Sequence, residues 1–212
     1  MFLLNELALI TLSAGILIYI ALLFYSTKRR KMSRRNALGR IYKNWVHVRL
    51  QDNTPYNAIQ AIRNVMMADS TFISALLILI GILVGLNSAN FLDQSLFFGI
   101  PGITWGFIQF ICNMFVSIFC LFSFILSIRM FARLSLLISG DPLNSSYTAQ
   151  QGEELTNEAF ISAQNHWMQG VRALMYLGST LSWLVHPILS ICVSIIVTVY
   201  LIRFQDIWVF KI

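Results

Sequence analysis

The sequence predicts an all-α integral membrane protein, a helical bundle with four transmembrane helices and one amphipathic basic helix on the cytoplasmic side. Its 212 residues are 57% hydrophobic and only 11% charged, and the mean hydropathy is +0.70. Soluble domains contain about 25% charged residues. Four apolar stretches are each long enough to cross a hydrocarbon core of roughly 30 Å. We expect a single membrane domain over residues 1–212, with spans at about 2–25, 64–87, 105–128 and 173–202.

The first span, residues 2–25, is expected to stay in the membrane. A cleaved signal peptide has basic residues in front of its apolar run, whereas this run has Glu6 near its start and basic residues only behind it. Nine of the fifteen Lys and Arg residues lie between Lys28 and Arg49, so the positive-inside rule predicts a cytoplasmic segment 28–53 and an outside N-terminus. Four spans then place residues 139–170 in the cytoplasm and the C-terminus outside. The expected membrane is the plasma or inner membrane.

The cytoplasmic segment 28–53 contains an amphipathic helical pattern. Apolar residues recur on one side from Leu38 to Val48, and basic residues cover the remainder. Such a helix is expected to lie on anionic lipid headgroups. The residues predicted to contact lipid are Arg34, Arg35, Arg40, Lys43 and Trp45. A docking surface for another protein is the alternative, and no nucleic-acid partner is expected because the segment is next to the membrane.

A helix is predicted to begin at Thr54, whose side chain can cap its first turn, and Pro55 suits the first helical position. This helix continues without a break into the second span. Arg63, Asn64 and Asp69 lie within the three turns before the wholly apolar part. Ionisable groups at that depth need partners. We therefore predict a buried polar cluster at the cytoplasmic end of the bundle, drawn from Arg63, Asn64, Asp69, Arg129 and Arg172. In the alternative, Arg63 snorkels to the headgroups and Asp69 lies in water at the interface.

The third span, residues 105–128, has small and polar residues on one face. They recur at helical spacing and are Asn113, Ser117, Cys120 and Ser127. The pattern predicts a helix-packing seam, with the lining of a pathway as the alternative.

The fourth span, residues 173–202, is predicted as one helix with a kink where Pro187 removes a backbone donor. His186 is expected to be a hydrogen-bonded packing residue; in the alternative it lines a pathway with Asn113 and Ser117. Small residues repeat every four positions along this span, and small side chains let helices approach closely. The predicted helix interfaces are Gly81 and Gly85 in the second span and Gly178 and Ser182 in the fourth.

The run WVHVRL from Trp45 and the run AIQAIRNVMMADSTFIS from Ala58 resemble the family known as domain of unknown function five-nine-nine. The matching residues are Trp45, Gln60, Arg63, Asn64, Met67 and Ala68. The later runs SIRMFARLSLLI around Arg129 and VRALMYLGSTLSW around Arg172 are similar to the rest of that family in order and spacing, so the resemblance covers nearly the whole chain. It implies a four-span helical membrane protein of no established activity, and Asp69 is not assigned to the pattern.

The sequence contains no catalytic motif such as HExxH, GxSxG or a Walker or Rossmann loop. The three cysteines lie inside apolar runs without a CxxC pattern, so neither a disulfide nor a zinc site is expected. We expect a protein that is not an enzyme and that uses no cofactor or metal. Two functions stay open: a non-catalytic membrane component that self-associates or is an accessory subunit of a larger complex, and a small oligomeric channel or carrier. The expected partners are anionic lipid headgroups and either further copies of the chain or another membrane protein.

Overall fold

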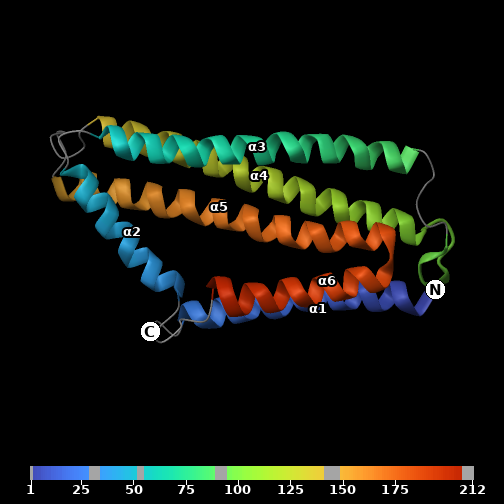
Figure 1. Cartoon of the computed structure of the whole chain (residues 1–212). Helices are drawn as coiled ribbons and strands as arrows, with labels where there is room; N and C mark the ends of the chain where they lie inside the picture. Colours follow the sequence, from blue (N-terminus) through green and yellow to red (C-terminus); the bar gives the residue numbers. More distant parts are fainter. Residues whose placement is uncertain (1, 29–33, 52–54, 89–94, 141–148, 207–212) are drawn as a thin grey trace. The chain divides into compact units, whose positions relative to one another are not determined.

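The computed structural model of the chain describes residues 2–28, 34–51, 55–88, 95–140 and 149–206, and all of its long elements are helices (Figure 1). They are α1 (Phe2–Lys28), α2 (Arg34–Leu50), α3 (Tyr56–Ser88), α4 (Trp105–Ser139), α5 (Ala149–Val185) and α6 (Pro187–Tyr200). A short 3-10 helix, η1 (Phe97–Gly99), precedes α4, and a π-helical segment, η2 (Leu201–Asp206), follows α6. The predicted all-α class is confirmed. The predicted helix cap Thr54 lies outside the described residues.

Three of the described helices, α1, α3 and α4, are long and apolar enough to cross a membrane. They contain 27, 33 and 35 residues, which is about 40 to 52 Å at 1.5 Å per residue. Many of their large apolar side chains are exposed, among them Leu3, Ile78 and Phe115 at 79%, 66% and 71%. Contiguous exposed apolar surface is unfavourable in water and is the normal state in lipid. The long apolar helices therefore indicate a membrane protein.

The predicted fourth span, residues 173–202, is not one helix. Helix α5 ends at Val185, His186 is extended with φ −160° and ψ 135°, and α6 begins at Pro187. Proline suits the first position of a helix, and it disfavours helical backbone in the residue before it. The imidazole Nδ1 of His186 accepts a hydrogen bond from the Ile188 backbone N–H at 3.2 Å, which caps the new helix. Pro187 therefore ends one helix and starts another, and the predicted single span is wrong.

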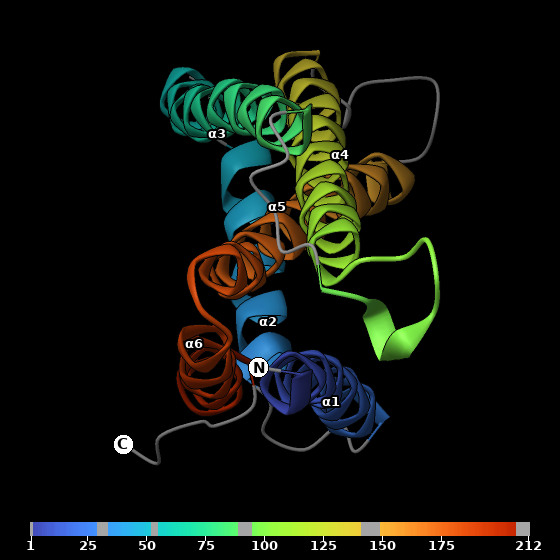
Figure 2. The same ribbon diagram turned by 90° about the vertical axis from the view of Figure 1, so that its right-hand side faces the viewer.

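Helix α6 folds back along the end of α5 as the second arm of a hairpin, which Figures 1 and 2 show. The Ser179 hydroxyl donates to the Ser190 carbonyl at 3.2 Å, and the Tyr176 and Thr198 hydroxyl oxygens are also 3.2 Å apart. In one continuous helix these pairs would be separated by about 16 and 33 Å. The small-residue series of the predicted fourth span is therefore divided between two antiparallel helices.

The described helices form two compact units. Unit 1 comprises Met1–Asn36, Leu77–Cys120 and Val171–Ile212, and unit 2 comprises Ala37–Leu76 and Leu121–Gly170. Helices α3, α4 and α5 each contribute residues to both units.

Within unit 1, α1 and α6 pack side by side (Figures 1 and 2). Ala8 belongs to a core cluster against which Ile191 packs, and seven residues further along each helix Gly15 faces Thr198. The two helices therefore run parallel, so α6 ends on the same side of unit 1 as α1.

Unit 2 has a core to which four helices contribute. Its buried members are Val46 of α2, Ala58 and Ile62 of α3, Phe131, Leu134 and Ile138 of α4, and Ala159, Phe160 and Ala163 of α5. Trp45 of α2 stacks on Phe160, with ring centroids 5.1 Å apart and an interplanar angle of 16°. The apolar face of α2 therefore packs against protein, because Ala159, Phe160 and Ala163 of α5 offer it an apolar surface.

Candidate functional site

Asp69 occupies a core position in the seam between α3 and α4 in unit 2. Buried and half-buried residues recur on α3 at alternating spacings of four and three, at Ala58, Ile62, Val65, Asp69, Phe72 and Leu76. The matching buried series on α4, read backwards, is Ile138, Leu134, Phe131, Ser127 and Phe124. This spacing is that of a coiled-coil seam, in which each position inserts between the side chains of the facing helix. Asp69 and Ser127 form a polar layer between apolar ones.

The Asp69 side chain is completely buried, and neither carboxylate oxygen has a hydrogen-bond partner within the described part of the chain. The Ser127 hydroxyl is also buried and faces this carboxylate, and it has no other hydrogen-bond partner among the described residues. One turn along the seam, the Phe72 and Phe124 rings stack with centroids 5.0 Å apart. A Cβ added at Gly170 of α5 would lie 2.7 Å from the Phe124 ring, so only glycine leaves room for this stack. The stack closes one side of the polar layer.

The other members of the predicted buried cluster lie elsewhere. Arg63 and Asn64 of α3 are exposed because the seam turns Ile62 and Val65 inward instead, and Arg129 of α4 is exposed as well. Within the described part of unit 2, none of these three side chains pairs with Asp69, so the cluster predicted there is not formed. Arg172 is half-buried in unit 1, and its pairing with Asp69 stays a prediction.

Two amide side chains of α4 hold the broken end of α5 in unit 1. The Gln109 Nε2 donates to the Trp183 carbonyl at 3.3 Å, and the Asn113 Nδ2 donates to the Thr180 carbonyl at 3.1 Å. The last four carbonyls of a helix have no partner in that helix, and Trp183 is one of them. Both amides therefore bind α5 near its broken end. Ser117, one turn further on, is buried and its hydroxyl makes no hydrogen bond to a described residue.

Polar contacts also join α1 to the α5–α6 hairpin. The Trp183 Nε1 donates to Asn5 Oδ1 at 3.0 Å, and the Tyr176 hydroxyl donates to the Gly15 carbonyl at 3.4 Å. A Cβ added at Gly15 would lie 2.7 Å from the Thr198 hydroxyl oxygen, so this glycine permits the close approach of α1 and α6. The sequence interpretation missed Asn5, Gly15 and Gln109 as contact residues. The sequence signal that could have identified them is that each is a small or polar residue within an apolar run.

The predicted interface glycines lie on open surfaces. A Cβ added at Gly81, Gly85 or Gly178 would meet no other atom of the described chain within 4 Å, apart from the local helix backbone. Ser182 is half-buried, and its hydroxyl donates to the Gly178 carbonyl one turn earlier at 2.7 Å. These positions are not used for close packing within the described chain.

The predicted lipid-contacting residues of α2 have different surroundings. Arg40 and Lys43 are exposed, whereas Trp45 is half-buried against Phe160. The side chains of Arg34 and Arg35 lie outside the described residues. The Trp45 ring docks α2 on α5, and its contact with the headgroups stays a prediction.

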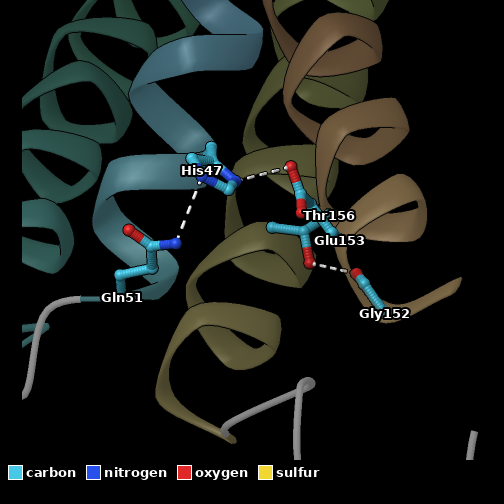
Figure 3. Close-up of polar contacts among 5 residues, drawn as sticks. All are labelled: His47, Gln51, Gly152, Glu153 and Thr156. Atoms are coloured by element: carbon cyan, nitrogen blue, oxygen red, sulfur yellow. Dashed lines mark hydrogen bonds and ion pairs between the residues drawn. The ribbon is translucent and has the colours of Figure 1, made fainter. Parts of the chain in front are cut away.

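A hydrogen-bonded His–Glu pair joins the end of α2 to the start of α5 in unit 2 (Figure 3). The His47 Nδ1 and Glu153 Oε1 are 3.1 Å apart, and the Gln51 Nε2 lies 3.2 Å from His47 Nε2. In the neutral ring with its proton on Nδ1, His47 donates to Glu153 and accepts from Gln51. The Thr156 hydroxyl donates to the Gly152 carbonyl within α5 at 2.8 Å. Because the His47 and Glu153 side chains are 50% and 33% exposed, the pair is a surface contact between helices.

The described residues contain no group of three His, Cys, Asp or Glu side chains that could hold a metal ion. Among known families, the model described as "Protein of unknown function, DUF599" matches residues 7–207. No curated protein matches the chain. No solved structure matches it either.

Proposed function

The chain belongs to the DUF599 family, and we propose that it acts as a non-catalytic integral membrane protein that assembles with further copies of itself. The observation that carries this proposal is the open glycine ridge of α3. Gly81 and Gly85 are one turn apart, and nothing else in the described chain covers them within 4 Å. At about 100° per residue, the buried Leu83 lies about 160 to 200° around the helix from both glycines. The ridge therefore faces away from the core of its own chain.

A glycine inside a helix is unfavourable by roughly 0.5 to 1 kcal/mol relative to alanine. Gly15 and Gly170 are explained by the side chains that fill the space above them. Gly81 and Gly85 have no such contact, and their small size is explained by the close approach of a helix from another molecule. A second copy of the chain is the simplest source of that helix, because a symmetric contact needs only one such ridge.

The test is the mass of the detergent-solubilised full-length protein by native mass spectrometry. Wild type is expected to be an oligomer, and Gly81→Leu or Gly85→Leu is expected to shift it to the monomer. Ala75→Leu is the matched control, since it places the same leucine side chain on an exposed flank of α3 outside the ridge. A monomeric wild type, or equal masses for all variants, would reject self-association. Purification from native membranes with a different protein at fixed stoichiometry would favour the accessory-subunit alternative.

The hairpin also revises the proposed topology. The basic segment after α1 favours the cytoplasmic side for the end of that helix. Helix α6 runs parallel to α1, which supports a fifth crossing by α6 and a cytoplasmic C-terminus in place of the outside position predicted from four spans. Exposed Arg203 then follows the positive-inside rule, and exposed Arg40 and Lys43 remain candidates for contact with anionic headgroups.

A channel or carrier is the second candidate function. The small and polar face of α4 supports this function, because Asn113 Oδ1 and the hydroxyls of Ser117 and Ser127 are buried without hydrogen-bond partners in the described chain. Flux of a monovalent ion or small solute into vesicles that contain the purified protein would support this function. Equal flux in wild type and a Ser117→Val variant would count against a path along that seam.

A further inference from the structure

We propose that Asp69 and Ser127 form a proton-exchange site in the α3–α4 seam, in which Asp69 holds one exchangeable proton and Ser127 accepts its hydrogen bond. This inference is independent of the proposed self-association. It rests on the position of a completely buried carboxyl group opposite a buried hydroxyl, both without any other partner in the described chain.

The neighbouring layers show how strongly the site excludes water. Four residues before Asp69 lies Val65, and four residues after Ser127 on the antiparallel helix lies Phe131, which is 1% exposed. On the other side, the Phe72–Phe124 stack covers the layer. A carboxylate between two apolar layers loses its hydration, and a group in that position takes up a proton unless a positive charge compensates it.

No positive charge in the described part of unit 2 compensates Asp69. Arg63 on the same helix and Arg129 and Arg133 on α4 are exposed. His166 on α5 is half-buried, and neither it nor any of these arginines makes an ion pair or hydrogen bond with Asp69 among the described residues. The Glu158 carboxylate on α5 is exposed and is therefore hydrated.

The oxygen atoms of this polar layer suit a proton better than a metal cation. The layer offers three side-chain oxygens, two from Asp69 and one from Ser127, whereas hard divalent cations take about six to eight. The surrounding backbone carbonyls belong to continuous helices and are used by the helical hydrogen bonds. A protonated carboxyl needs only one acceptor, and the Ser127 hydroxyl supplies it.

Exchange follows a simple balance. When water enters the layer, the Asp69 O–H bond breaks, the proton passes to water and the carboxylate remains hydrated; the reverse step restores the dry seam. The carboxylate form is incompatible with the closed apolar layers, so proton release favours separation of α3 from α4 at this level.

The test is infrared spectroscopy of the full-length protein in lipid vesicles at neutral pH. Wild type is expected to show the C=O stretch of a protonated carboxylic acid, and Asp69→Asn is expected to lack it. Glu158→Gln is the matched control and should keep this band while it loses carboxylate intensity. The band should shift in deuterium oxide, and Ser127→Ala should move it to the position of a carboxyl group without that hydrogen bond.

Three results would overturn the proposal. The first is a difference spectrum between wild type and Asp69→Asn that contains only carboxylate bands. The second is an acid band that does not shift in deuterium oxide. The third is the replacement of the acid band by carboxylate bands when sodium is added at constant pH. The last result would identify an alkali-cation site. If Asp69→Asn does not fold, carbon-13 labelling of the aspartate carboxyls in a variant whose other aspartates (Asp52, Asp93, Asp141 and Asp206) are asparagine gives the same decision, because only the Asp69 band then shifts.

Discussion

Replacing Gly15 by alanine tests the close contact between α1 and α6. The new Cβ would lie 2.7 Å from the Thr198 hydroxyl oxygen, which itself donates to the Ser194 carbonyl at 2.8 Å and lies 3.2 Å from the Tyr176 hydroxyl. Overpacking of this kind costs about 1 to 3 kcal/mol, and a weakened hydrogen bond adds about 1 kcal/mol. Alanine favours the helix by about 1 kcal/mol. We expect a net loss of about 1 to 3 kcal/mol in the free energy of unfolding.

The measurement is reversible unfolding of the purified protein in detergent, with Gly39→Ala as the matched control. Gly39 is also inside a helix, but a Cβ there meets nothing within 4 Å, so this variant should be neutral or about 1 kcal/mol more stable. The double variant Gly15→Ala, Thr198→Ala should recover part of the loss, with a coupling of about 0.5 to 3 kcal/mol. If Gly15→Ala is as stable as Gly39→Ala, the close approach of α1 and α6 is refuted.

Three further outcomes are expected. Gly170→Ala should lower stability by about 1 to 3 kcal/mol, because its Cβ would lie 2.7 to 2.9 Å from three atoms of the Phe124 ring, and Phe124→Leu should relieve the loss in the same unfolding assay. Glu153→Ala should change stability by less than about 1 kcal/mol, since its contact with His47 is exposed, and a larger loss would show that the pair is essential to the docking of α2. A reporter fused to the C-terminus should be active in the cytoplasm, whereas activity outside would contradict a crossing by α6.

The first three predicted spans follow from composition, because long apolar runs leave few alternatives to a helix. The fourth was misread at Pro187. A proline within an apolar run is compatible with a kink and with a new helix, and the two differ only in the backbone of the preceding residue. His186 is extended, and its imidazole caps α6. Gln109 and Asn113, which come from another helix, donate to carbonyls near the end of α5, and these contacts are not visible in the sequence of the fourth span alone.

The candidate site was predictable in part. Asp69 was correctly identified as a residue that needs explanation, but an arginine partner was expected because pairing is the usual way to bury a carboxylate. The alternating spacing of four and three along α3 assigns Asp69 to the seam and Arg63 to the surface. The pattern of residues 38–48 predicted a helix, and α2 is one. A pattern of this kind does not distinguish lipid from the Phe160 surface that Trp45 contacts.

The contacts of α1 with the α5–α6 hairpin have a consequence for the order of folding during synthesis. Asn5 meets Trp183 across 178 residues of sequence, and Gly15 meets Tyr176 across 161. During translation, α1 therefore waits for more than 160 further residues before these partners emerge from the ribosome. Contacts this distant in sequence form late. A chain terminated before α6 would keep Tyr176 but would leave Gly15 without Thr198 against it, and we expect such products to be recognised by membrane quality control.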